Sequence, residues 1–264
     1  MKNIFNAKRF GLLFKKTLLE RPAQMSGLIG LMLVVILILY FIFKSQFSFG
    51  AAQNIAFIWG LAGGGCFLAS YVFGYFSSNA NGSSYLTLPA SHFEKWLCGI
   101  LIVGVIYPII FLSFYRLMDA GFIALFHKSL DPENPLYKEQ YNSVYTFSFT
   151  GRIATRVYYT FLLFTGAAML GSLYFNKAAF IKTALLFCAI CLAIFGLNWF
   201  FAELLFGKID SAFPFRDVGI LMGKEVGSVE LPKNAFAIVS YILDYTLPIL
   251  LWILTYVRLR EKEF

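Results

Sequence analysis

Long apolar runs alternate with shorter polar connections along this chain. Six of these runs are each near the roughly 20 residues that a helix needs to cross a bilayer. They cover about residues 26–43, 52–76, 97–116, 153–175, 183–206 and 236–257. No connection between them is large enough to fold as a second domain. We therefore predict an all-α polytopic membrane protein with six transmembrane helices, in a single transmembrane domain over residues 1–264.

The stretch before the first run has a different pattern, in which apolar residues recur at helical spacing between basic ones. The apolar positions are Ile4, Ala7, Phe10, Phe14 and Leu18, and the basic positions are Lys8, Arg9, Lys15 and Lys16. A helix with one apolar and one basic face lies along the membrane interface. We predict such an amphipathic helix over residues 4–20, ended by Arg21-Pro22.

Two features distinguish individual spans. The second run carries small residues at every fourth position, which are Ala52, Ala56, Gly60 and Gly64. Small residues in that register let two helices approach closely, so this face is predicted to pack against another helix. The third run contains Pro108 and the sixth Pro248, and proline bends a helix because it removes a backbone donor.

Composition and charge support this class. Of 264 residues, 59% are hydrophobic and 14% are charged, whereas about a quarter of a soluble domain is charged. With the N-terminus inside, the inner segments hold twelve Lys and Arg and the outer segments nine. That bias predicts cytoplasmic termini, in a membrane such as the bacterial inner membrane. The net charge of +8 then suits anionic membrane lipid better than nucleic acid.

A short polar segment, residues 83–96, separates the second and third runs. Pro89 stands where a helix can start, and Ser91 is followed three residues later by Glu94. In the Ser-x-x-Glu arrangement the hydroxyl and the carboxylate accept hydrogen bonds from the free backbone donors of a first helical turn. The pattern predicts a short helix along the membrane surface that turns into the third span. The residues alone also allow a simpler interpretation, a well-capped helix start.

Together with the six-span layout, Leu86-Thr87-Leu88-Pro89-Ala90-Ser91-His92-Phe93-Glu94-Lys95 resembles a segment of the type-2 ABC exporter permeases. Their segment reads Leu-Pro-small-Ser-Arg, is followed by a Lys, and forms the coupling helix that docks on the ATP-binding subunit. Here His92 stands where an Arg is commoner. The resemblance implies that the residues contacting the ATPase are Leu88, Pro89, Ala90, Ser91, His92, Phe93, Glu94 and Lys95.

The chain has no Gly-x-x-x-x-Gly-Lys-Ser/Thr phosphate loop, so an exporter built on it would hydrolyse ATP in another polypeptide. The resemblance accordingly implies two kinds of partner, an ABC ATPase subunit and a second permease subunit, identical or different. We expect no enzymatic activity, cofactor or metal in this chain. Cys188-x-x-Cys191 lies inside an apolar run and is interpreted as packing.

Polar side chains at bilayer depth are candidates for function because burying them in lipid is costly. Arg116 and Asp119 are one turn apart near the outer end of the third run, where each can reach the interface or pair with the other. Glu203 also lies near an outer end. Asp244 lies about 12 Å into the sixth run at 1.5 Å per residue. Asn198 of the fifth run has a similar depth, which predicts a hydrogen bond between them or, alternatively, a contact with a polar substrate.

The two longest connections lie outside in this topology. Residues 127–151 are predicted to form an irregular loop, and residues 207–235 a small packed cap or a re-entrant segment. Two other functions stay open from the residues. One is a self-contained ion-coupled transporter or channel that uses Asp244, Glu203 and Asp119, and the other is a membrane scaffold that transports nothing. An apolar, aromatic-rich interior suits lipids, peptides and drugs alike.

Overall fold

The computed structural model describes residues 5–20, 22–74, 82, 88–175, 178–222, 225–230 and 232–261. Within this part of the chain, six helices are long and apolar enough to cross a membrane, which confirms the predicted all-α polytopic class. We refer to them as spans one to six. They are Pro22–Gln46, Phe49–Val72, His92–Ser129, Arg152–Tyr174, Ala179–Phe206 and Lys233–Glu261.

Three of the spans are single helices, and the other three contain a π-helical turn. The single helices are α2 (Pro22–Gln46), α9 (Arg152–Tyr174) and α10 (Ala179–Phe206). Span two consists of α3 (Phe49–Ile58), η1 (Trp59–Gly63) and α4 (Gly64–Val72). Span three consists of α6 (His92–Leu101), η3 (Ile102–Ile106) and α7 (Tyr107–Ser129). Span six consists of α11 (Lys233–Tyr241), η4 (Ile242–Thr246) and α12 (Leu247–Glu261).

Two of the π turns, η3 and η4, stand immediately before the prolines that the sequence places in spans three and six. Pro108 and Pro248 cannot donate a hydrogen bond to the preceding turn. The residue before each proline donates instead to the carbonyl five positions back, that of Ile102 in η3 and that of Ile242 in η4. The predicted interruptions are therefore wide helical turns that leave each span continuous.

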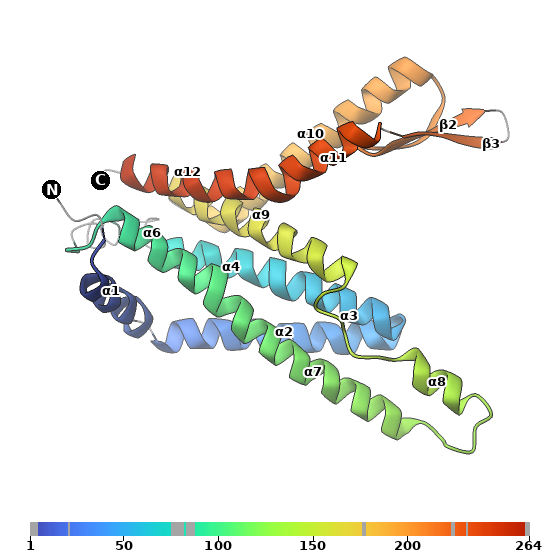
Figure 1. The fold of residues 1–264 in the computed structure, drawn as a ribbon, viewed down its shortest axis with the longest axis horizontal. Coiled ribbons are helices and arrows are strands. Elements are labelled where there is room, and N and C mark those ends of the chain that lie inside the picture. The colour runs from blue at the N-terminus through green and yellow to red at the C-terminus, as the bar shows by residue number, and fades with distance from the viewer. Residues whose placement is uncertain are drawn as a thin grey trace.

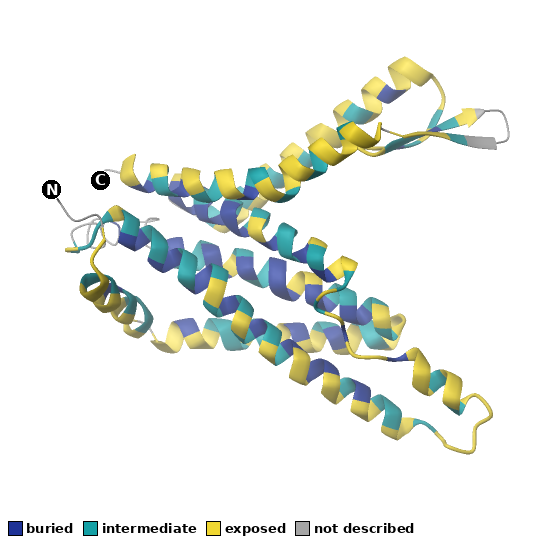
Figure 2. Cartoon of the chain, in the orientation of Figure 1, coloured by how far each residue is buried: buried dark blue, intermediate teal, exposed yellow. Residues whose placement is uncertain are grey.

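The spans differ in how far the chain itself covers them (Figures 1 and 2). In the most apolar 18 residues of each span, half are buried in spans two and four, 33% in span three and 11% in span one. The corresponding share is 6% in span six and 0% in span five. We call spans one to four the body. Spans five and six pack on α9 but diverge from the body toward one end of the molecule.

The small-residue face of span two lies inside the body, against span three. Ala52 and Ala56 are fully buried. A Cβ atom added to Gly64 would collide with the hydroxyl of Tyr107, and that hydroxyl donates a hydrogen bond to the carbonyl of Gly60. Glycine thus brings an aromatic side chain of span three into contact with the backbone of span two, the close approach that the spacing predicts.

Span six docks on spans three and four through one indole ring. Trp252 of α12 lies against two glycines, and a Cβ atom would stand 2.8 Å from this ring at Gly104 and 2.6 Å from it at Gly166. The indole N–H donates to the carbonyl of Leu162 at 2.9 Å. The backbone carbonyl of Trp252 accepts a hydrogen bond from the indole of Trp96 at 3.0 Å. Span six is therefore held at this level by size complementarity and by two hydrogen bonds.

The N-terminal helix and the long connections lie at opposite ends of the molecule (Figure 1). We call these the α1 end and the sheet end. Helix α1 (Ala7–Leu19) begins after Asn6, whose side-chain oxygen accepts hydrogen bonds from the backbone N–H groups of Lys8 and Arg9. Its bounds agree with the amphipathic helix expected over residues 4–20, of which residue 4 lies outside the described residues.

The sheet end contains more regular structure than the sequence suggests. Span three continues to Ser129, and α8 (Tyr137–Ser143) lies within the stretch expected to be an irregular loop. The described residues between Gly207 and α11, where a small packed cap or a re-entrant segment was expected, contain a small sheet. They form an antiparallel three-stranded meander of β1 (Ile209–Phe213), β2 (Asp217–Met222) and β3 (Glu225–Glu230), in the order β1-β2-β3.

Candidate functional site at the start of span three

The polar segment before span three ends in the capping box that its sequence predicts. Ser91 has extended backbone angles, and its hydroxyl accepts a hydrogen bond from the backbone N–H of Glu94 at 3.2 Å. The carboxylate of Glu94 accepts one in return from the backbone N–H of Ser91 at 2.9 Å. The first turn of α6 thereby gains acceptors for two donors that the helix itself leaves free.

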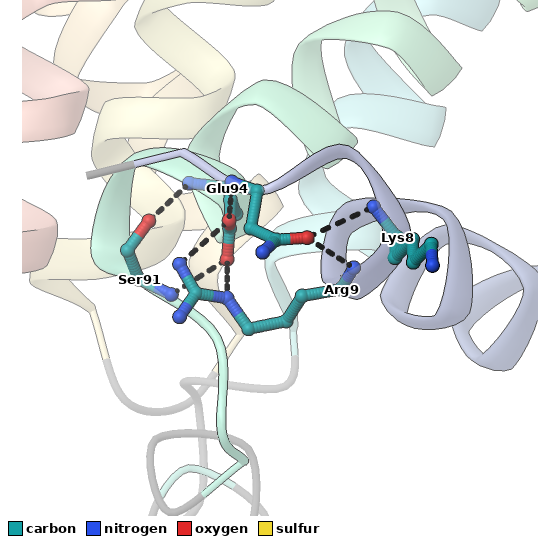
Figure 3. Close-up of polar contacts among 5 residues, drawn as sticks. Lys8, Arg9, Ser91 and Glu94 are labelled. Atoms are coloured by element: carbon teal, nitrogen blue, oxygen red, sulfur yellow. Dashed lines mark hydrogen bonds and ion pairs between the residues drawn. The ribbon is translucent and has the colours of Figure 1, made fainter. Parts of the chain in front are cut away.

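The same carboxylate also holds α1 (Figure 3). The guanidinium of Arg9 donates to both oxygens of Glu94, each at 2.7 Å, and the backbone N–H of Asn6 donates to one of them at 2.8 Å. The side chain of Glu94 is fully buried, whereas that of Arg9 is 35% exposed. Burial alone would raise the pKa of Glu94, but the hydrogen bonds from Arg9, Asn6 and Ser91 outweigh it and lower that pKa to about 2, so the pair is ionised at neutral pH. Two-pronged Arg–carboxylate pairs fix orientation as well as distance.

Aromatic contacts join the same turn to the end of span six. The ring of Tyr256 in α12 lies 6.1 Å from that of Phe93 and 5.6 Å from that of Trp96, measured between centroids. Phe93 also contacts Phe5 edge-on at 6.4 Å. The first turn of α6 therefore contacts α1 on one side and α12 on the other, which makes it the meeting point of three elements at the α1 end.

The residues implied as ATPase contacts divide by exposure. Pro89 and His92 are exposed, while Glu94 and Lys95 are buried inside their own chain. The remaining four are half-buried, namely Leu88, Ala90, Ser91 and Phe93. Residues 85–87 of this segment lie outside the described residues. A partner approaching the segment in this packing meets Pro89 and His92 first, and Glu94 and Lys95 serve internal packing.

Asp119 is the second buried carboxylate, and it lies toward the sheet end. One of its oxygens accepts from the Tyr40 hydroxyl at 2.8 Å and from the Gln53 amide at 2.9 Å. The other oxygen accepts from the backbone N–H of Phe147 at 2.8 Å. Three hydrogen bonds satisfy this fully buried group and tie spans one, two and three to the segment before α9.

Arg116 does not pair with Asp119 as the spacing allowed. Its guanidinium donates to the backbone carbonyl of Phe147 at 3.1 Å and stacks 4.4 Å from the centroid of the Phe149 ring. Asp119 and Arg116 therefore hold the same short segment, one through a backbone N–H and the other through a carbonyl. Both side chains thereby fix this segment against span three.

The hydrogen bond predicted between Asp244 and Asn198 is absent. The amide nitrogen of Asn198 is buried and has no hydrogen-bond partner. Asp244 lies eleven residues after Lys233, the first residue of α11, and Asn198 lies eight residues before Phe206, the last residue of α10. Asp244 therefore stands three residues farther from its helix end than Asn198 does. Glu203 is exposed near the end of α10.

The described residues contain no group of three or more His, Cys, Asp or Glu side chains that could hold a metal ion. Comparison of the chain with protein-family models, with curated proteins and with solved structures gave no match. Function must therefore be argued from the geometry. Sequence reasoning identified Ser91 and Glu94 but missed Arg9 as their partner, because no local pattern connects residues 85 positions apart.

Proposed function

We propose that this chain is the membrane-spanning permease subunit of an ATP-driven ABC exporter. The observation that carries the proposal is the first turn of α6, an exposed tip joined firmly to α1 and to α12. A force applied by a partner at Pro89 or His92 would pass to these elements without bending a loop, because Glu94 fixes α1 and Tyr256 packs on Phe93. That is the mechanical property a coupling helix needs.

Two further features support a multi-subunit exporter over a self-contained transporter. Asp119 is saturated by three hydrogen bonds and Glu203 is exposed at one end, which leaves Asp244 without a second deep acid to form a proton path. Span five buries none of its most apolar residues within the chain. In the proposed exporter, the ATPase docks at the α1 end in the cytoplasm, and a second permease subunit covers part of the exposed apolar surface.

Cross-linking from His92 tests the proposal. The chain carries His92→Cys, with its four native cysteines replaced by Ser, and is expressed in its native host. A photoactivatable maleimide is attached in isolated membranes, and photoreactive ATP then labels any nucleotide-binding polypeptide in the cross-linked band. We expect a band that carries the nucleotide label. The matched control is Lys138→Cys at the sheet end, which is exposed and should give no such band.

The same two variants test the topology. A membrane-impermeant maleimide added to intact cells should label Lys138→Cys and leave His92→Cys unlabelled. Labelling of His92→Cys from outside, or a cross-linked partner that binds no nucleotide, would overturn the proposed function.

A further inference from the structure

An aromatic and acidic cluster lies where α9 meets the π turn of span six. The hydroxyl groups of Tyr159 and Tyr245 are hydrogen-bonded, and their rings are 4.9 Å apart between centroids in an edge-to-face arrangement. Tyr241 packs on Tyr245 at 5.3 Å. Tyr241 is 62% exposed and Tyr245 44% exposed, so both side chains are accessible at the surface of the span.

Asp244 precedes Tyr245 in the same π turn and is not neutralised by its own chain. It is half-buried and has neither a hydrogen bond nor an ion pair to any described residue. Arg156, one turn before Tyr159 on α9, is exposed and forms no salt bridge with it. Asp244 lies eleven residues from the start of α11, about 16 Å at 1.5 Å per residue. An unpaired carboxylate at that depth in a span is costly, and such groups mark binding sites or ion paths.

The backbone of the π turn adds a second acceptor. Pro248 has no N–H, so it cannot donate to the carbonyls of Leu243 and Asp244, which precede it by five and four residues. The cluster therefore offers a carboxylate, a backbone carbonyl level with it, and the faces of two tyrosine rings. All of these attract positive charge, and the aromatic faces favour an organic cation over a small inorganic one.

We propose that Asp244, Tyr241 and Tyr245 form a binding site for the ammonium group of a membrane-borne amphiphile, which reaches the site laterally from the bilayer. The carboxylate supplies the counter-charge and the tyrosine rings supply cation–π contacts. A metal ion does not fit, because a single carboxylate is too few oxygen ligands for a hard divalent cation. The inference rests on the proposed export function, to which it adds a substrate class: lipid-soluble amines.

Direct binding to the purified chain in lipid nanodiscs tests this site. The probe is radiolabelled dodecylamine, with unlabelled dodecyltrimethylammonium, dodecanol and NaCl as competitors. We expect the two ammonium compounds to compete and dodecanol, which has the same alkyl chain, to fail. Asp244→Asn should weaken dodecylamine binding at least about tenfold, since it removes the charge that the ammonium contacts. Tyr241→Leu should weaken it about threefold to tenfold through the lost cation–π contact.

The matched control is Glu203→Gln, which removes an exposed acid elsewhere in the same half of the molecule and should leave binding unchanged. Unaltered thermal unfolding shows that each variant is folded. Equal competition by dodecanol, unchanged binding in Asp244→Asn, or displacement by millimolar NaCl would each overturn the site. Because no ATPase is present in this assay, its failure is distinct from a failure of the His92 cross-link.

Discussion

The polar side chains of the body and those of the two-helix arm formed by spans five and six differ in how far their own chain satisfies them. In the body, Glu94 and Asp119 are fully buried, and each receives several hydrogen bonds from residues that are distant in sequence. In the arm, Asp244 and Asn198 have unmet hydrogen-bonding capacity, and the helices that carry them are almost uncovered. The buried polar groups of the body are thus hydrogen-bonded within the chain. The arm, in contrast, has exposed apolar surface and polar groups without hydrogen-bond partners among the described residues.

From this contrast we expect the substitution of Asp119 to lower the free energy of unfolding more than the substitution of any other acid discussed. Asp119→Leu removes the acceptor of three buried hydrogen bonds, from Tyr40, Gln53 and Phe147. The Gln53 amide keeps only its second bond, to the carbonyl of Tyr145. At about 1–3 kcal/mol for each orphaned group, we expect a loss on the order of 4 kcal/mol in the free energy of unfolding. Unfolding by denaturant in lipid nanodiscs measures it. Glu203→Leu, in the arm, is the matched control and should stay within about 0.5 kcal/mol of the parent.

Crowding the close contact in the body should be nearly as severe. A Cβ atom at Gly60 would already collide with the Phe111 ring, so Gly60→Leu forces spans two and three apart and should cost about 3 kcal/mol. Yield of folded chain and thermal unfolding report the change. Gly196→Leu in span five is the control, because nothing lies within 4 Å of a Cβ atom there. Equal effects of the two substitutions would show that the body is no more tightly packed than the arm.

Breaking the link between α1 and span three should have an intermediate effect. Arg9→Ala leaves Glu94 with the two backbone donors of Asn6 and Ser91 but without its counter-ion. Because the Arg9 side chain is partly exposed, the loss in the free energy of unfolding should be smaller than that of breaking a fully buried pair. Proteolysis within α1 should become faster. Lys8→Ala changes an exposed neighbour and should leave both measurements alone, and an equal response in the two variants would contradict the link.

The smallest effect on stability is predicted for the arm's own acid. Asp244 has no partner among the described residues, so Asp244→Leu removes a charge without orphaning a donor. We expect the free energy of unfolding to stay within about 0.5 kcal/mol of the parent or to rise. A loss above about 1 kcal/mol would show that Asp244 has a structural partner, and the difference between body and arm would disappear.

Local patterns in the sequence predicted the helical elements. They did not predict the contacts between residues that are distant in the chain. The six spans and the Ser91–Glu94 capping box follow from hydropathy and from a four-residue pattern. The partners of Asp119 lie 66 and 79 residues away in the chain, and no local pattern indicates them. The hydrogen bond predicted between Asp244 and Asn198 does not form among the described residues, because similar counts from the edges of two apolar runs do not place two side chains against each other.

The sheet was missed for a related reason. Its strands are short, and glycines at Gly219 and Gly227 interrupt the alternation of apolar and polar residues that identifies a strand. In the structure these glycines occupy consecutive paired rows, with Gly219 opposite Ser228 and Gly227 opposite Ile220. Antiparallel hydrogen bonding across three strands, which no single stretch reveals, compensates for the weak individual signals.

The bond between Arg9 and Glu94 also imposes an order on biogenesis. Translation produces Arg9 and Asn6 first, and the carboxylate that holds them is added 85 residues later. At about 5–20 residues per second, the nascent α1 waits roughly 4–17 s for its anchor. During that interval α1 can contact the membrane through its apolar stripe and can contact the neighbouring α2, but Glu94 is still missing. Helix α1 can therefore reach its final position only after the start of span three has been synthesised.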